Sequence, residues 1–265
     1  MSLPDHSITN DAGKVTIFLQ HGIYGAKEYW RFVTQRLIAK GYRVVAMDAP
    51  GYNLSPLPEE FSFDVVANAA SRLVEATGTA KNVFFGHSMG GQITPRIVSK
   101  VPGRIHAAVI SATIGYFGNR TPEEQKEFVA KRTAPPPAGT DPLTAQRMVV
   151  DSMLGPGASG QEVELVRQIA GNTPPATVQK AVKAVAAYPE SEAVAKIKGL
   201  TIPTLLVAGE VDQTGHVAGM KRVADMIPGS SFGVVGGSGH YPWAENPAEF
   251  NAIFFGFLDK YVPAK

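Results

Sequence analysis

VFFGHSMGGQ, residues 83–92, places a serine between glycines where an apolar run ends and a helical pattern begins. Gly86, Ser88 and Gly90 form a G-x-S-x-G pattern, which by itself arises often by chance. At a sharp strand-to-helix turn the serine backbone is strained, and side chains two residues away would collide, so glycine suits both positions. The stretch therefore predicts either a turn that presents Ser88 at a helix N-terminus, or a tight turn with an incidental serine.

Outward from this turn, short apolar runs alternate with helical patterns along the chain. Each run is apolar throughout, which is typical of parallel strands covered by helices on both faces. The alternation predicts a doubly wound, mostly parallel α/β sheet, and such sheets bind ligands at the carboxyl ends of their strands. The predicted strands are residues 15–19, 42–48, 82–85, 105–111, 204–209 and 231–236.

Residues 116–197 break this rhythm, because they contain helix-start signals and no convincing strand. Thr121 and Ser159 each begin a capping-box pattern, and Asp141 precedes a proline that suits a first helical turn. We expect a helical insertion that serves mainly as a lid, and the pattern leaves open whether its last helix belongs to the core. The core segments would be residues 1–115 and 198–265.

The composition excludes several classes of protein. The 265-residue chain has no cysteine, which rules out disulfides, thiolate metal sites and a cysteine nucleophile. Its net charge of +2 is scattered and does not point to nucleic acid or to an acidic membrane. No apolar run is long enough to cross a bilayer, and the N-terminus does not match a secretory signal. We expect a cytoplasmic protein that binds a small molecule, and its oligomeric state stays open.

A nucleophilic serine needs a base and an orienting acid, and both residue types follow later strands. Asp212 comes after the fifth predicted strand, and His240 comes after the sixth. Because the carboxyl ends of parallel strands meet at one edge of a sheet, both residues would lie near Ser88. Glu210 is an alternative acid but still lies in the strand-like run. His216 is an alternative base but has the setting of an early helix residue.

The order serine, aspartate, histidine resembles that of the α/β-hydrolase family, and the resemblance covers nearly the whole chain. The expected lid position, after the fourth predicted strand, is also similar. One departure is that only about 14 residues precede the first run, so the family's opening two-strand hairpin is shortened or absent. The remaining landmarks of the family are His21-Gly22, DAPGYNLS (48–55), GEVD (209–212) and GSGHYPWAENPAEF (237–250).

This resemblance implies a catalytic triad with Ser88 as nucleophile, His240 as general base and acid, and Asp212 as orienting acid. It also implies an oxyanion hole made by the backbone N–H groups of Ile23 and Met89. Three further residues are candidates for the pocket lining, with ordinary core packing as the alternative for each. These candidates are Tyr24, His87 and Trp243.

The expected activity is that of a serine hydrolase that cleaves a small carboxylic ester or lactone through an acyl-enzyme. The same triad also fits a carbon–carbon bond hydrolase, a hydroxynitrile-lyase-like enzyme, or a slow-turnover ligand receptor on this scaffold. Serine at position 88, where aspartate would stand, disfavours a dehalogenase or an epoxide hydrolase. The six histidines lack metal-ligand spacing and no phosphate-binding glycine loop opens a helix, so we expect no metal and no cofactor.

Overall fold

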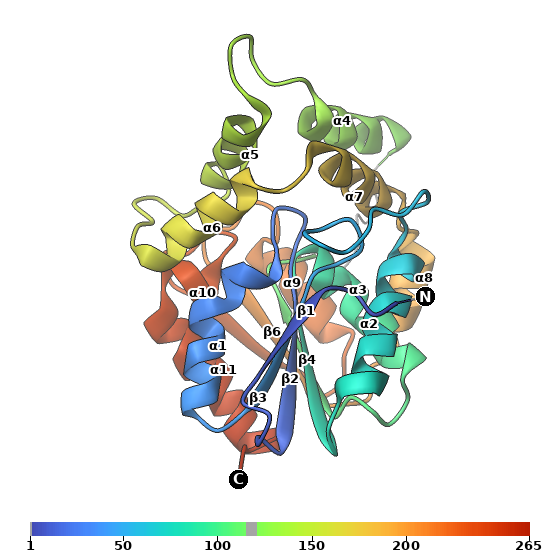
Figure 1. Ribbon diagram of the computed structural model, residues 1–265, viewed down its shortest axis with the longest axis vertical. Coiled ribbons are helices and arrows are strands. Elements are labelled where there is room, and N and C mark those ends of the chain that lie inside the picture. Colours follow the sequence, from blue (N-terminus) through green and yellow to red (C-terminus); the bar gives the residue numbers. More distant parts are fainter. Residues whose placement is uncertain (1, 115–120) are drawn as a thin grey trace.

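The computed structural model describes residues 2–114 and 121–265. Within these residues one sheet has the strand order β1-β3-β2-β4-β5-β6-β7 (Figure 1). Neighbouring strands pair in parallel except β1, which pairs antiparallel with β3, so the predicted mostly parallel sheet is confirmed. The strands are β1 His6–Thr9, β2 Val15–Gln20, β3 Arg43–Met47, β4 Lys81–His87, β5 Ala107–Ser111, β6 Thr204–Gly209 and β7 Ser231–Val235.

The central strands β2, β3, β5 and β6 are buried along their whole length, which explains why their sequences do not alternate. Leu206 and Ala208 of β6 pack with Met220 and Val223, whereas Leu205 belongs to a separate cluster. Figure 1 places α1 and α11 on one face of the sheet, and α2, α3 and α8 on the other. The core helices are η1 Lys27–Trp30 (a 3-10 helix), α1 Arg31–Ala39, α2 Phe63–Thr77, α3 Met89–Lys100, α9 Val217–Asp225, α10 Pro242–Glu245 and α11 Pro247–Tyr261.

A single edge strand, β1, precedes β2, where the sequence predicts that the opening two-strand hairpin is shortened or absent. It has four residues and pairs with β3 in register, from His6 opposite Met47 to Thr9 opposite Val44. Asp5 extends this contact, because its carbonyl oxygen accepts the Asp48 N–H at 2.8 Å. This one strand therefore covers the edge of β3.

Helices follow one another between β5 and β6, as the helix-start signals predict. The predicted caps at Thr121 and Asp141 are confirmed, since both side chains accept N–H groups of the first turn. The predicted cap at Ser159 is wrong: Gly160 precedes the helix with a φ of 106°, a conformation that glycine takes readily. The helices are α4 Pro122–Thr133, α5 Pro142–Asp151, α6 Gln161–Gly171, α7 Pro175–Ala187 and α8 Glu190–Lys198.

These helices fall into two contacting pairs, α4 with α7 and α5 with α6 (Figure 1). Helix α6 also contacts η1 and α10, while α8 contacts α3. The expected boundary between core and insertion, at residues 115 and 116, lies outside the described residues. Over the described parts of the chain, no helix combines the length and hydropathy that a bilayer crossing requires.

Candidate active site

Ser88 lies in the sharp turn between β4 and α3, as its sequence context predicts. Its backbone angles, φ 53° and ψ −116°, are unusual for a residue with a side chain. A Cβ on Gly86 would lie 2.3 Å from the Gly90 carbonyl oxygen, and one on Gly90 would lie 2.6 Å from the Gln20 carbonyl oxygen. Both glycines are therefore required by the close approach of backbone that this turn demands.

His240 links the serine to an acid. Its Nε2 lies 3.0 Å from Ser88 Oγ, and its Nδ1 lies 2.9 Å from Asp212 Oδ2. An ionised carboxylate only accepts, so Nδ1 carries the hydrogen and Nε2 presents a lone pair to the Ser88 hydroxyl. Asp212 and His240 are each 2% exposed, so the line of three groups is shielded from water except at the serine end.

The electrostatics of Asp212 suit a charged orienting group. Burial raises the pKa of this carboxyl, but the charge attraction and hydrogen bond of His240 oppose burial, and the Thr214 N–H adds to them. The net result is a pKa below the usual value of 3.8. Asp212 Oδ1 accepts the Thr214 N–H at 2.7 Å, which leaves Oδ2 directed at the imidazole.

The two alternative residues take other roles. Glu210 Oε2 accepts the Gly237 N–H at 2.8 Å, which uses its carboxylate on the backbone of the histidine turn. His216 is the N-cap of α9, where its Nδ1 accepts the Gly219 N–H at 2.9 Å. The structure thus brings Ser88, Asp212 and His240 together and assigns Glu210 and His216 to local backbone contacts.

The loop after β2 lies directly against the serine. A Cβ on Gly22 would be 2.8 Å from Ser88 Cβ, and Ile23 lines the same cavity as Ser88 and Met89. Met89 is the first residue of α3, so its N–H has no acceptor within the helix. Ile23 and Met89, the two residues singled out by the sequence, therefore border the same cavity as the serine.

His21 holds this loop and does not contact the serine. Its Nε2 accepts the Ala49 N–H at 3.0 Å, so its Nδ1 carries the hydrogen and donates to the Gly22 carbonyl at 2.7 Å. Burial lowers the pKa of His21, with Asp48 as the largest opposing influence. The neutral, buried His21 ring therefore connects the loop after β2 with the loop after β3.

A carboxylate that the sequence analysis missed holds the histidine turn. Glu245 Oε1 accepts the Tyr241 N–H at 2.8 Å, and its Oε2 accepts the N–H groups of Gly239 at 2.9 Å and Gly155 at 2.6 Å. The His240 N–H itself donates to the Met153 carbonyl at 2.8 Å. The turn between α5 and α6 thus helps to hold His240 in position. An acid five residues after the histidine, beside glycine-rich backbone, was the available signal.

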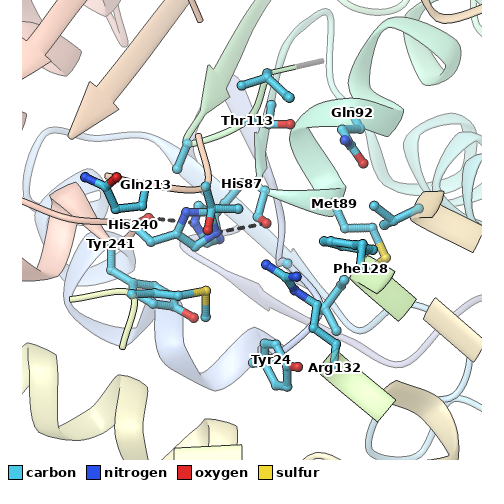
Figure 2. Close-up of a pocket in the computed structure, with 18 of the residues that line it drawn as sticks. Tyr24, His87, Met89, Gln92, Thr113, Phe128, Arg132, Gln213, His240 and Tyr241 are labelled. Carbon is cyan, nitrogen blue, oxygen red and sulfur yellow. Dashed lines mark hydrogen bonds between the residues drawn. The ribbon is translucent and has the colours of Figure 1, made fainter. Parts of the chain in front are cut away.

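The serine opens into a cavity of about 450 Å³, which is within the usual range for small-molecule sites. Tyr24 and His87 line it, as expected for pocket residues (Figure 2). Trp243 is not among the lining residues and packs edge-on against the His87 ring, with centroids 4.4 Å apart. Helix α4 adds Phe128 and Arg132, the guanidinium lying 3.9 Å above the phenyl ring. The wall therefore combines aromatic surface with charge.

Metal-ligating side chains do not gather here. Across the described residues, no group of three histidine, aspartate or glutamate side chains is placed to hold a metal ion. The chemistry available at the cavity is that of a hydroxyl, an imidazole, a buried carboxylate and backbone N–H donors. Such a set can activate a nucleophile and stabilise an oxyanion.

Comparison with known proteins finds similarity along most of the chain. Lipase 3 of Moraxella sp. is 22% identical over 253 residues, covering 86% of this chain and 72% of the lipase. An esterase from Thermogutta terrifontis (24% identical) superposes with a TM-score of 0.82 and covers 97% of this chain and 93% of its own. The enol-lactonase of Burkholderia xenovorans (18% identical) gives 0.81, with coverages of 96% and 95%. The profile of the alpha/beta hydrolase fold family matches residues 15–247, and the protein is therefore an enzyme belonging to that family.

Proposed function

We propose that this enzyme is a serine hydrolase that cleaves a carboxylic ester or lactone of a small molecule through an acyl-enzyme. The observation that carries the proposal is the position of His240, within hydrogen-bond distance of both Ser88 Oγ and Asp212 Oδ2. The aromatic cavity beside the serine supports a small organic substrate. The esterase and enol-lactonase with similar folds are in keeping with this reaction class.

In the proposed acylation, Ser88 Oγ attacks the carbonyl carbon of the substrate while His240 Nε2 takes the hydroxyl proton. Asp212 keeps Nδ1–H in place and stabilises the imidazolium that forms. The backbone N–H groups of Ile23 and Met89 would bind the negative oxygen, and one such donor is worth about 3 kcal/mol in the transition state. The carbon–oxygen bond to the leaving group then breaks, and His240 returns its proton to that oxygen.

Deacylation repeats these steps with water. His240 Nε2 removes a proton from the water molecule, whose oxygen attacks the acyl carbon of the Ser88 ester. The bond from acyl carbon to Ser88 Oγ breaks, and the serine recovers its hydrogen from His240. A free carboxylic acid leaves the site, and with a lactone the acid and alcohol leave as one molecule.

We further propose that residues 116–197 act as a lid whose α4 and α7 determine the shape of the cavity. Phe128 of α4 and Val185 of α7 line the cavity beside the serine, which supports this role. Helix α8 contacts α3 of the core, so we assign α8 to the core and the preceding helices to the lid.

The test is a panel of p-nitrophenyl esters and lactones of graded acyl length, run on the wild type and four variants. Ser88→Ala and His240→Ala are expected to abolish turnover, and Asp212→Asn to lower kcat by a factor on the order of 10³–10⁴. Glu210→Gln is the matched control, because it makes the same carboxyl-to-amide change on the same loop, and it should leave kcat near the wild-type value.

A pre-steady-state burst of p-nitrophenol from p-nitrophenyl acetate is expected, because acylation releases it before the acyl-enzyme hydrolyses. Labelling of Ser88 by a fluorophosphonate without any burst or turnover on the panel would reject the ester and lactone hydrolase. Turnover retained by Ser88→Ala would reject the mechanism altogether.

A further inference from the structure

His87, the residue before the serine, is a buried titratable group that the proposed reaction does not use. Its side chain lies between two fixed partners: Nδ1 is 3.0 Å from Tyr29 Oη, and Nε2 is 2.9 Å from the His240 carbonyl oxygen. His87 is 1% exposed and Tyr29 is 2% exposed. Both ring nitrogens are therefore engaged in a site that water does not enter freely.

The direction of each hydrogen bond follows from the chemistry of the partners. A carbonyl oxygen only accepts, so His87 Nε2 carries a hydrogen and donates it to His240. Burial, with a contribution from nearby His240, lowers the pKa of His87 well below its usual value, so the ring is neutral and Nδ1 is an acceptor. Tyr29 Oη then donates to Nδ1.

Tyr29 has a second contact that completes the chain. Its Oη accepts the Gly22 N–H at 2.9 Å, and burial raises its pKa well above the usual value, so it keeps its proton. Each group has one role: Gly22 N–H donates to Tyr29, Tyr29 O–H donates to His87, and His87 N–H donates to the backbone of His240. Reversing any one of these bonds would leave a buried polar atom without a partner.

The ends of this chain lie on the two sides of the serine. Gly22 directly precedes Ile23, the proposed oxyanion donor, and His240 is the proposed base. We propose that Tyr29 and His87 are positioning residues that set the oxyanion loop and the imidazole relative to each other across Ser88. This inference rests on the proposed function, because it assigns the two residues to the machinery of that reaction.

Packing keeps the chain in one geometry. The Trp243 ring meets His87 at an interplanar angle of 77°, and it also lies 5.2 Å, centroid to centroid, from Tyr29. A side chain held by rings on its faces and by hydrogen bonds at both nitrogens has few alternative rotamers. The position of the His240 carbonyl is therefore coupled to the position of the Gly22 amide.

The experiment compares Tyr29→Phe, His87→Leu, the double variant and His87→Gln. The readouts are kcat and KM for p-nitrophenyl acetate, and the rate constant for fluorophosphonate labelling of Ser88. All rates are expressed per labelled serine at the labelling endpoint, which removes loss of folded protein from the comparison. Tyr42→Phe is the matched control, because it also removes a buried hydroxyl. In the wild type that hydroxyl donates to the carbonyl of Val262, the C-cap of α11, at 3.1 Å.

Tyr29→Phe and His87→Leu should each lower kcat about tenfold or more, with KM changed by less than about threefold. His87→Gln, whose amide can still donate to the His240 carbonyl, should recover most of the loss. The double variant should lose less than the product of the two single losses, as expected for members of one chain. Tyr42→Phe should leave kcat unchanged.

Three results would overturn the inference: rates per labelled serine equal to the wild type, fully multiplicative single losses, or no recovery in His87→Gln. The labelling rate keeps this test separate from that of the proposed function. If the wild type labels at Ser88 but hydrolyses no ester, the hydrolase proposal fails. The same four variants then still test the chain, because attack by Ser88 on the probe also depends on His240 as base.

Discussion

Replacing Ser88 by glycine should give a more stable fold than replacing it by alanine, although both variants should be inactive. Ser88 has φ 53° and ψ −116°, a region that residues with a Cβ occupy at a cost of about 1–3 kcal/mol. Alanine keeps this cost because it keeps the Cβ. Glycine removes it, but loses about 0.5–1 kcal/mol through the greater freedom of its unfolded chain.

The difference between the two variants is about 1 kcal/mol in favour of glycine, after the entropy of glycine is subtracted from the strain. The hydroxyl hydrogen bond to His240 is absent from both and cancels. For a chain of this size, 1 kcal/mol corresponds to a Tm difference of about 2 °C or slightly more. The proposed nucleophile thus occupies a position where the fold would be more stable without a side chain.

The measurement is reversible urea unfolding, supported by thermal scans, of Ser88→Gly and Ser88→Ala at equal protein concentration. Ser111 supplies the control, because it ends the neighbouring strand β5 with no positive φ. At that position glycine should be less stable than alanine by about 0.5–1 kcal/mol. If Ser88→Gly is equal to or less stable than Ser88→Ala while the control pair behaves as expected, the backbone at Ser88 is not strained.

Other perturbations test other parts of the site. Glu245→Gln places an amide NH₂ against a backbone N–H, so the free energy of unfolding in urea should fall by about 1.5–3 kcal/mol and kcat/KM should fall as well. The control Glu249→Gln, on a nearby carboxylate, should leave the kinetics unchanged. The folded-state pKa of Asp212 lies below 3.8, so its stabilising contribution is complete above that value and is lost as the pH falls through the lower folded-state pKa. The Tm advantage of the wild type over Asp212→Asn should therefore narrow below about pH 4, and a constant gap would contradict the charge interaction. Gly256→Ala, in open space on α11, should add about 0.5–1 kcal/mol of stability without altering kcat, while Gly155→Ala would put a Cβ 2.3 Å from a carbonyl of the histidine turn and should lower kcat.

Much of the framework can be predicted from short stretches because its causes are local. The run at 204–209 is apolar throughout, and it forms β6 with those bounds because both of its faces are covered. The glycines on either side of Ser88 mark a turn whose sterics depend mainly on the turn itself. Ser159 shows the limit of local patterns, since a capping-box sequence is overridden when glycine at the next position takes a positive φ.

The contacts that tune the site could not be predicted in the same way. Glu245 bonds to Gly155, 90 positions away, and its partners are backbone N–H groups that every non-proline residue has. Tyr29 and His87 likewise meet only because η1 and the end of β4 pack on the same side of the serine. Local sequence patterns do not identify such pairs, because they form only when segments far apart in the chain pack together.

The contacts that hold His240 in position have a consequence for recombination among related proteins. The Met153 carbonyl and the Gly155 amide hold the histidine turn, so the helical segment after β5 is not an independent cassette. A chimaera that exchanges the whole segment also exchanges the backbone groups of Met153 and Gly155 that hold the histidine turn. A chimaera that exchanges only α4 and α7 would change residues that line the cavity and would keep Met153 and Gly155. We therefore expect substrate preference to change more readily through substitutions in α4 and α7 than through substitutions in the turn between α5 and α6.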